Sequence, residues 1–392
     1  MQPGGTILSD LVDRLRDFRN RKVADPAFRR WAARFPLTRT VARRQAKALF
    51  DLTAGFVYSQ VLHASVKVGL FHALAAGPLD IATISARIGL PLHSAEKLLK
   101  AAAALGLVEA RAGDRFALGA LGAALVHNEG VQQVILHHDI LYDDLRDPLA
   151  LLAGKGDMQL RKYWSYCGED RDPIALPRGH AEYTRLMAAS QAMITAEVLD
   201  AYRFDRYRRL LDVGGGDGSF LIAAGRAAAA LELSMFDLPP VAEIARQRIL
   251  EAGLASRATV HGGSFFDEEL PQGADVVTLN RVLHDHDDDR ALALLEVIRR
   301  AIAPQGTLLI AEPMAGTRGA EASGDAYFGF YLMAMGQGRP RSFEEIRGML
   351  ERSGFGEVRE ITTNVPLIAR IASARPANAK PANKGRMTVK TN

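Results

Sequence analysis

The chain has 392 residues, of which 48% are hydrophobic, and a formal net charge of +4. This length predicts two or three domains with sizeable cores, and the single cysteine, Cys167, excludes an internal disulfide and fits a reducing compartment. No run of 18 uncharged apolar residues occurs, and the first residues lack the basic-then-apolar pattern of an export signal, so we expect a cytoplasmic protein without a membrane span.

Both ends of the chain are basic and its body is acidic. Residues 1–50 contain 12 Lys or Arg and 4 Asp or Glu, and residues 375–392 contain 5 basic residues and no acidic one, which leaves a net −9 for residues 51–374. Basic ends can bind anionic lipid or nucleic acid, or they can be solvated segments that keep a protein soluble. We expect the basic tail, 373–392, to be disordered because it is rich in Pro, Asn and Lys.

The basic N-terminal segment, 1–40, mixes aromatic, aliphatic and basic side chains. Phe28, Trp31, Phe35 and Leu37 alternate with arginines, as they do in a helix that lies at a membrane interface. Peripheral contact with a membrane and a merely solvated segment are both open at this point.

The next part of the chain predicts a helical domain with a small hairpin. Helical periodicity covers 42–76, and two short helices, Leu79–Ile88 and Ser94–Leu105, are joined by a tight connection. The segments on either side of Ala112-Gly113-Asp114 predict a hairpin, the wing of a winged helix. The second short helix has only two lysines and a long apolar face, so we expect it to pack against other helices, and we expect no nucleic-acid partner.

Strands and helices alternate from Leu210 onward, after a mostly helical stretch, 120–185, and a long helix, His180–Ala201. The alternation predicts a parallel sheet that is covered on both faces. The predicted strands are 210–214, 233–237, 258–262, 274–279 and 306–312, and the predicted helices are 218–229, 239–253, 288–303 and 342–353. Gly356–Ile361 and Val365–Ile371 are expected to form a strand pair that closes one edge of the sheet.

The stretch LLDVGGGDGSF, Leu210–Phe220, is typical of a strand, a tight glycine turn and a helix. Glycine lets a ligand approach the backbone, and the start of the helix offers free N–H groups. Asp212 and Asp217 flank the turn and would repel phosphate, which favours a ligand with a cationic end and an adenosine. Dinucleotide binding stays open, although GGGDG does not fit GxGxxG.

A second strand, Leu233–Asp237, ends in a carboxylate about 20 residues past the turn, where α/β nucleotide folds place the acid that binds ribose hydroxyls. Capping of the helix that begins at Pro239 is the alternative role for Asp237. His284 follows the strand that starts at residue 274, in the segment VLHDHDDD, where open α/β sheets place their ligand crevice. A base and a metal site both fit His284 and its neighbours on residue type alone, although adjacent residues of an extended segment point to opposite faces.

The motifs DVGGGDG, FDLP, GGSFFDEELPQGADVVTLNRVLHDHDDD and GTLLIAEPM, in this order, resemble the S-adenosylmethionine-dependent small-molecule O-methyltransferases over roughly residues 40–372. The resemblance implies an α/β fold: a Rossmann-like methyltransferase domain, 186–372, with a mostly parallel, doubly wound sheet and an antiparallel edge. It also implies a preceding winged-helix-like dimerisation domain, 41–185, a homodimer, and S-adenosyl-L-methionine (SAM) as the cofactor.

The resemblance also assigns roles to single residues. The glycine turn would lie against the methionine part of SAM, Asp237 would bind the ribose, Ser264 would replace the usual acid at the adenine amine, and Phe265 would pack on the adenine. The cofactor-binding residues implied in this way are Asp212, Gly214, Gly215, Gly216, Asp237, Leu238, Ser264, Phe265 and Arg281.

His284 would be the general base, with no metal, and Glu312 would hold its tautomer. Family members often have a second flanking Glu, but the corresponding segment here, Gly338–Arg341, contains no acid, and Asp325 is a candidate substitute.

Two stretches outside these motifs, FPLTRTVARRQAKALFDLTAGFVYSQVL and GDAYFGFYLMAMGQGRPRS, look like the carotenoid hydroxyl methyltransferases of purple bacteria. This likeness implies a large apolar acceptor, the tertiary hydroxyl of an acyclic hydroxy-carotenoid such as demethylspheroidene, met at the photosynthetic membrane. Aromatic and thioether side chains are expected to line its pocket: Met187, Tyr327, Phe328, Tyr331 and Met335. Another apolar acceptor, such as a polyketide phenol or a bacteriochlorophyll precursor, and a non-enzymatic ligand sensor are the alternatives.

Overall fold

The computed structural model describes residues 7–163 and 180–377, with the side chains of the long helix α11 (His180–Ala201) described from Gln191 onward. The chain divides into two compact units between Val126 and His127. No helix of the described residues is long and apolar enough to cross a membrane. The tail predicted to be disordered, 373–392, starts too early in the chain, because Arg370–Pro376 form the last strand of the sheet. The tail from 378 onward lies outside the described residues.

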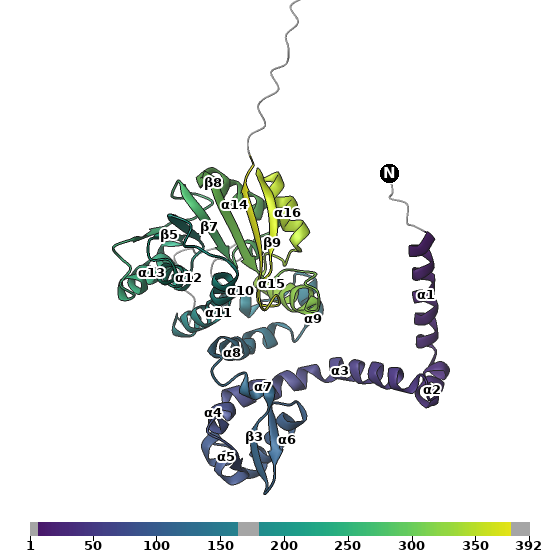
Figure 1. Cartoon of the computed structure of the whole chain (residues 1–392). Coiled ribbons are helices and arrows are strands. Elements are labelled where there is room, and N and C mark those ends of the chain that lie inside the picture. The colour runs from purple at the N-terminus through teal and green to yellow at the C-terminus, as the bar shows by residue number, and fades with distance from the viewer. Residues whose placement is uncertain (1–6, 164–179, 378–392) are drawn as a thin grey trace, which may run out of the picture. The chain divides into compact units, whose positions relative to one another are not determined.

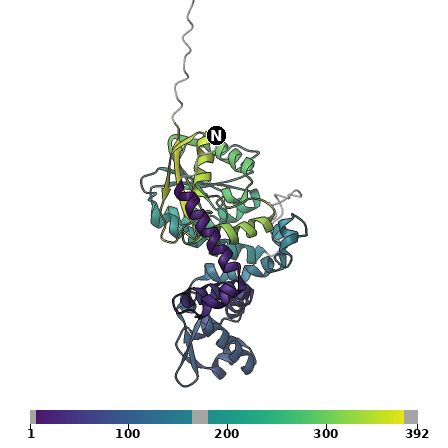
Figure 2. The same ribbon diagram turned by 90° about the vertical axis from the view of Figure 1, so that its right-hand side faces the viewer.

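The first unit is a set of helices with a three-stranded sheet in the order β1-β3-β2 (Figure 1). Figures 1 and 2 show the first three helices following one another with sharp bends between them. The helices are α1 (Ile7–Ala24), α2 (Pro26–Arg34), α3 (Arg39–Lys67), α4 (Leu70–Leu74), α5 (Ile81–Ile88), α6 (Leu92–Ala104) and α7 (Ala120–Ala123), and the strands are β1 (Leu79–Asp80), β2 (Val108–Arg111) and β3 (Arg115–Leu118).

Local sequence explains where these elements begin and end. The predicted helix 42–76 is divided at Gly69, whose left-handed backbone (φ +70°) separates α3 from α4. The Asp80 side chain caps α5 by accepting a hydrogen bond from the Thr83 N–H (2.9 Å), and the left-handed Gly89 ends that helix. The predicted hairpin is confirmed, since β2 and β3 pair antiparallel around the Ala112–Asp114 turn.

The second unit is built on a seven-stranded sheet in the order β6-β5-β4-β7-β8-β10-β9. The first five strands in this order are parallel, and β10 runs antiparallel to both β8 and β9. The strands are β4 (Arg209–Val213), β5 (Glu232–Asp237), β6 (Ala258–Gly262), β7 (Ala274–Asn280), β8 (Ile302–Glu312), β9 (Phe355–Ile361) and β10 (Arg370–Pro376). The predicted Rossmann-like fold with an antiparallel edge is therefore confirmed.

One predicted strand is wrong. The last strand covers Arg370–Pro376 rather than Val365–Ile371. The residues before it form a turn: the Thr363 hydroxyl donates to the carbonyl of Ala369, and the Val365 N–H donates to the Glu197 carboxylate of α11 (2.9 Å). A tertiary contact thus removes the apolar start of the predicted strand from the sheet.

Helices cover both faces of this sheet (Figures 1 and 2). On one face, the buried side chains of α14 (Asp288–Ala301) and α16 (Phe343–Arg352) pack against the strands. On the other face lie α11 (His180–Ala201), α12 (Ser219–Ala227) and α13 (Pro239–Glu251). The apolar stripe of each helix faces the sheet, which gives one apolar core on each side of it. The carboxyl ends of the parallel strands are left open to a ligand.

A third apolar cluster joins helices from two parts of the chain. The helices α8 (Glu129–Asp144), α9 (Pro148–Leu152) and α10 (Gln159–Tyr163) pack against α15 (Gly329–Met335), and a π-helical turn, Ala322–Phe328, leads into α15. Residues 127–163 thus pack within the second unit, whereas the sequence assigns them to the domain 41–185.

Candidate active site

A cavity of about 310 Å³ lies at the carboxyl ends of β4, β5 and β7. This is the edge of an open α/β sheet where ligands bind. Twelve of the sixteen side chains or backbone positions predicted for the site line the cavity: Gly214, Gly215, Gly216, Asp237, Leu238, Ser264, Phe265, Arg281, His284, Phe328, Tyr331 and Met335. Motifs that are far apart in the chain thus meet at one cavity.

The glycine turn after β4 leaves no room for larger residues. Gly214 has a left-handed backbone (φ +69°), and its N–H donates to the carbonyl of Phe236 (2.8 Å). A Cβ on Gly214 would lie 2.6 Å from a Val282 methyl carbon, and one on Gly215 would lie 2.6 Å from the Cγ of Met235. The turn consequently presents bare backbone to the cavity.

Asp237 at the end of β5 is tied to the glycine turn. One carboxylate oxygen accepts a hydrogen bond from the Gly216 N–H (2.7 Å), and the other accepts one from the Leu238 N–H (2.7 Å). Burial raises the pKa of Asp237 to about 6, although these two hydrogen bonds oppose the rise. Each oxygen keeps a further lone pair with which it can accept a ligand hydroxyl.

Asp212 lies beneath the turn and does not line the cavity. Its Oδ1 accepts hydrogen bonds from the Thr278 hydroxyl (2.6 Å) and the Asn280 amide (3.2 Å), and its Oδ2 has no partner among the described residues. Burial raises the pKa of Asp212 to about 7. The second acid that flanks the turn, Asp217, forms an ion pair with Arg248, so its charge is compensated within the chain.

Two neighbouring phenylalanines line the cavity. Phe265 and Phe266 meet edge to face with ring centroids 4.6 Å apart, and the Ser264 hydroxyl accepts a hydrogen bond from the Phe266 N–H (3.3 Å). The His286 ring stands edge-on to both phenylalanines, and the Arg290 guanidinium lies 3.8 Å from the Phe266 centroid. The sequence predicted Ser264 and Phe265 but not Phe266 or Arg290, whose only signal was adjacency to the motif.

His284 lies in a 3-10 turn, Leu283–Asp285, that follows β7. Its side chain lines the cavity and is only 2% exposed, and its Nε2 is 3.3 Å from Oδ1 of Asp285. Burial, together with the positive charges of Arg281 and Arg341, lowers the pKa of His284 well below its usual value. The imidazole is therefore neutral near pH 7 and can accept a proton.

The carboxylate of Glu312 contacts the main chain of His284. Its Oε2 accepts a hydrogen bond from the His284 N–H (3.1 Å), while Oε1 has no partner among the described residues, and burial raises the pKa of Glu312 to about 7. The carboxylate next to the imidazole ring is instead that of Asp285, to which the sequence assigned no such role. Asp325 accepts a hydrogen bond from the Gly316 N–H and does not line this cavity.

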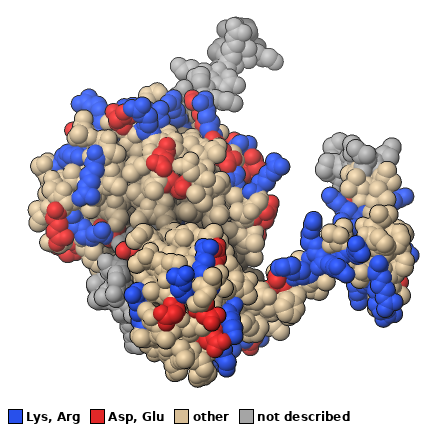
Figure 3. Space-filling view, turned by 60° about the horizontal axis from the view of Figure 1, so that its bottom comes forward, with Lys and Arg blue, Asp and Glu red and all other residues tan. Residues whose placement is uncertain are grey.

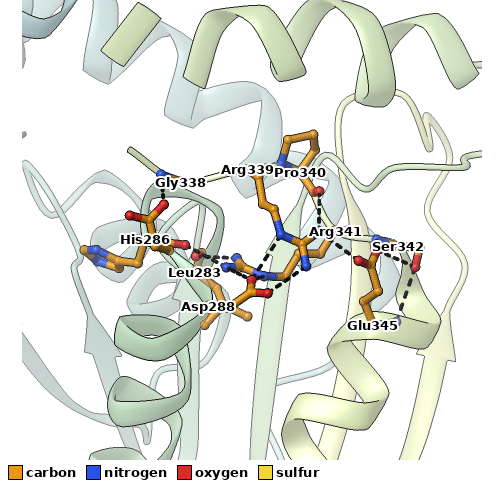
Figure 4. Close-up of polar contacts among 10 residues, drawn as sticks. Leu283, His286, Asp288, Gly338, Arg339, Pro340, Arg341, Ser342 and Glu345 are labelled. Atoms are coloured by element: carbon orange, nitrogen blue, oxygen red, sulfur yellow. Dashed lines mark hydrogen bonds and ion pairs between the residues drawn. The ribbon is translucent and has the colours of Figure 1, made fainter. Parts of the chain in front are cut away.

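Arg341 holds the loop that carries His284 (Figure 4). This fully buried arginine donates to the carbonyls of Leu283 (3.0 Å) and His286 (2.7 Å), which bracket His284, and to the carboxylate of Asp288 (2.8 Å). The nearby Arg339 N–H donates to the carbonyl of His284 itself (2.9 Å). The segment Gly338–Arg341, which lacks the expected acid, thus fixes the main chain of the histidine loop.

Two phenol hydroxyls at or near the cavity contact histidines of α8. The Tyr331 hydroxyl is 2.9 Å from Nε2 of His137, and the Tyr327 hydroxyl is 2.8 Å from Nε2 of His138. Tyr331 lines the cavity and Tyr327 lies behind it. The predicted Met187 belongs to α11, but its side chain lies outside the described residues.

Family models match both parts of the chain: an O-methyltransferase dimerisation domain matches residues 50–128, and an O-methyltransferase domain matches residues 164–356. The demethylspheroidene O-methyltransferase of Cereibacter sphaeroides is 41% identical over 380 residues, which is 96% of this chain and 97% of the relative. The chain belongs to the SAM-dependent O-methyltransferase family. A second demethylspheroidene O-methyltransferase, from Rhodobacter capsulatus, is 40% identical over 87% of this chain and 85% of its own length.

Solved structures agree with the fold of this methyltransferase. The mitomycin 7-O-methyltransferase MmcR has a TM-score of 0.69 and 26% identity, and the alignment covers 86% of this chain and all of MmcR. The calicheamicin-pathway methyltransferase CalO1, solved with S-adenosylhomocysteine bound, has a TM-score of 0.70 and 25% identity over 85% of this chain and 98% of CalO1.

The cavity of the methyltransferase fits SAM in three respects. A Cβ on Gly214 or Gly215 would clash with Val282 or Met235, so both positions stay bare backbone at the cavity, and a ligand can lie against it. A buried carboxylate, Asp237, ends β5 beside that turn, and the Oδ1 of Asn280 is a buried acceptor at the cavity wall without a partner among the described residues. Across the described ranges, no three His, Cys, Asp or Glu side chains converge as a metal site.

Proposed function

We propose that the enzyme transfers the methyl group of SAM to the tertiary hydroxyl of an acyclic hydroxy-carotenoid such as demethylspheroidene. The observation that carries the proposal is the 41% identity to a demethylspheroidene O-methyltransferase over 96% of this chain. The apolar acceptor side of the cavity, which includes Phe328, Tyr331 and Met335, is compatible with a polyene end.

In this proposal the cavity at the carboxyl ends of β4, β5 and β7 holds SAM by its ribose and its methionine part. Asp237 accepts hydrogen bonds from the ribose hydroxyls, and the glycine turn and Asn280 contact the methionine part. Phe265 and Ser264 contact the adenine, and Arg281, whose left-handed backbone (φ +57°) turns the chain at the end of β7, lies at the cavity wall. When bound, SAM supplies a methyl group on a positively charged sulfur, which an oxygen nucleophile can take.

His284 acts as the general base. Because its imidazole is neutral near pH 7, it accepts the hydroxyl proton as the acceptor oxygen forms its new bond to carbon. A tertiary alcohol is a weak acid, so the proton moves with methyl transfer rather than before it. Asp285, 3.3 Å from Nε2 in this structure, stabilises the imidazolium, and Glu312 and Arg341 hold the main chain of His284 in place.

The size of the cavity limits what part of the acceptor it encloses. A volume of about 310 Å³ is at the lower end of small-molecule sites, and SAM shares this cavity, so a C40 polyene enters with its hydroxylated end only. The remaining polyene extends outside the cavity. Methylation of a terminal hydroxyl needs no deeper entry, and correct positioning of that hydroxyl supplies much of the acceleration.

We also propose a homodimer formed by the first unit, in the reducing cytoplasm. The dimerisation-domain match begins at residue 50, and α3 exposes Phe50, Leu52 and Phe56 there. Light scattering of the purified protein should give twice the mass of the chain. A monomer at micromolar concentration would contradict this part of the proposal.

The acceptor is tested by steady-state kinetics with purified enzyme and detergent-solubilised substrates. We expect kcat/KM for an acyclic hydroxy-carotenoid to exceed that for a polyketide phenol or a bacteriochlorophyll precursor by at least tenfold, and His284→Ala to lower kcat about 100-fold or more. Efficient turnover of a phenol with none of the carotenoid would replace the carotenoid by another acceptor and leave the enzyme class unchanged.

A further inference from the structure

Helices α1 and α2 precede the dimerisation-domain match, and they expose large apolar side chains that no described residue covers. On α1, Leu11, Leu15 and Phe18 are each more than half exposed, and on α2 Trp31 is 50% exposed. Exposed apolar residues gathered on one element mark an interaction site when they lie together on one face.

The apolar residues of α1 share one face of the helix. Leu11, Leu15 and Phe18 are spaced by four and three residues, which places them on a single stripe. By the same helical spacing, Arg14 and Arg19 fall on the two flanks of that stripe, whereas Asp13 and Asp17 fall on the opposite side. An apolar face with flanking cations and opposite anions is the arrangement of a helix that lies in a membrane interface.

Helix α2 carries a cluster of aromatic rings. Phe28 and Trp31 have ring centroids 5.5 Å apart, and Trp31 stacks on Phe35 at 4.9 Å. The Asp25 side chain caps α2, and Arg29 donates to the carbonyls of Val23 and Ala24 at the end of α1, so the bend between the helices is hydrogen-bonded. Tryptophan is enriched at the level of lipid headgroups, where its apolar ring and its N–H are both accommodated.

Charge decides between a lipid surface and a second copy of the chain. Residues 1–50 carry 12 basic and 4 acidic residues, and Lys and Arg outnumber Asp and Glu on the N-terminal helices in Figure 3. Arg14, Arg21, Arg30 and Arg34 have no ion-pair partner among the described residues. A symmetric contact between the N-terminal helices of two copies would bring like positive charges together, whereas an anionic bilayer is complementary to them.

We propose that α1 and α2 bind the surface of an anionic bilayer, with the Leu11–Leu15–Phe18 face of α1 and the Trp31 ring entering the interface. The helices lie on the membrane and the catalytic unit remains in water. The inference does not depend on the identity of the acceptor. It gives an enzyme of this fold direct access to substrates that are dissolved in the bilayer.

The test uses the full chain with Trp164→Phe, which leaves Trp31 as the single tryptophan. On addition of phosphatidylcholine vesicles that contain phosphatidylglycerol, we expect the Trp31 emission to shift to shorter wavelength and the protein to sediment with the vesicles. Pure phosphatidylcholine vesicles should bind at least about tenfold more weakly, and added salt should weaken binding to the anionic vesicles.

Two variants on α1 form a matched pair. Leu15→Glu adds a charge on the apolar face and Asn20→Glu adds the same charge away from it. We expect Leu15→Glu to weaken vesicle binding about tenfold or more and Asn20→Glu to change it about threefold or less. SAM binding, measured by calorimetry, should be unchanged in both and shows that the variants are folded.

Three results would overturn the proposal: no sedimentation with anionic vesicles, equal losses in the two variants, or a change of oligomeric state in Leu15→Glu with vesicle binding intact. The last result would assign the face to a subunit interface. Since none of these measurements uses an acceptor, they are independent of the proposed carotenoid activity.

Discussion

Replacing Arg341 by methionine should both destabilise the catalytic unit and slow catalysis. The guanidinium is fully buried and donates to the carbonyls of Leu283 and His286, and Met leaves both acceptors without their charged donor. Hydrogen bonds from a charged donor contribute about 1.5–3 kcal/mol each, but water can reach part of the loop once the side chain is shortened. The pair with Asp288 adds little, since that carboxylate is half exposed and keeps Arg339 as a partner. We therefore expect a loss of about 2–4 kcal/mol.

Urea unfolding of the purified protein measures this loss, and steady-state kinetics measures the effect on the His284 loop. A shift of the imidazole by about 1 Å can cost about 100-fold, so kcat should fall at least tenfold, with a smaller change in KM for SAM. Arg339→Met is the matched control. The Arg339 guanidinium is 42% exposed and pairs with the same Asp288, so this substitution should lower the free energy of unfolding by less than about 1 kcal/mol. Equal stability and equal kcat in the two variants would refute the role assigned to Arg341.

Three further predictions concern the glycine turn, the base His284 and the buried acid Asp212. Gly214→Ala should weaken SAM binding in calorimetry at least tenfold, because its Cβ would meet a Val282 methyl carbon at 2.6 Å. An unchanged affinity for SAM would contradict the role assigned to the turn. Since the pKa of His284 is well below its usual value, kcat/KM should stay level between about pH 6.5 and 8, and a drop centred near 6.5 would contradict a depressed pKa. Burial raises the pKa of Asp212 to about 7, so the folded state keeps a proton that the unfolded chain loses near pH 4. The free energy of unfolding should therefore fall as pH rises from about 4 to 7. In thermal melts, Asp212→Asn should make this dependence on pH less steep.

Much of the second unit could be predicted from the sequence because its signals are local. The strands that carry the site end in short motifs, and the glycine turn, Asp237 and His284 follow them directly. In a parallel sheet these carboxyl ends meet at one edge, so residues 70 positions apart converge without further information. The helix His180–Ala201 was predicted with the bounds that the structure gives it.

What the sequence did not predict depends on contacts between distant segments. The last strand begins later than expected because Glu197 and Thr363 hold the preceding residues in a turn. The role of Arg341 follows from carbonyl groups more than 50 residues away, which no side-chain motif indicates. Likewise, His137 and Tyr331 are 194 residues apart in the chain, so no local motif indicates the contact between their side chains at the cavity.

The most direct test of the account is a transfer assay with SAM that carries a deuterated methyl group. Purified enzyme is incubated with the labelled SAM and a detergent-solubilised hydroxy-carotenoid, and the products are analysed by mass spectrometry. The account predicts a carotenoid methyl ether that carries the intact deuterated methyl, with at least about 100-fold less product from His284→Ala. Undiminished product from that variant, or no methyl ether from protein that binds SAM in calorimetry, would contradict it.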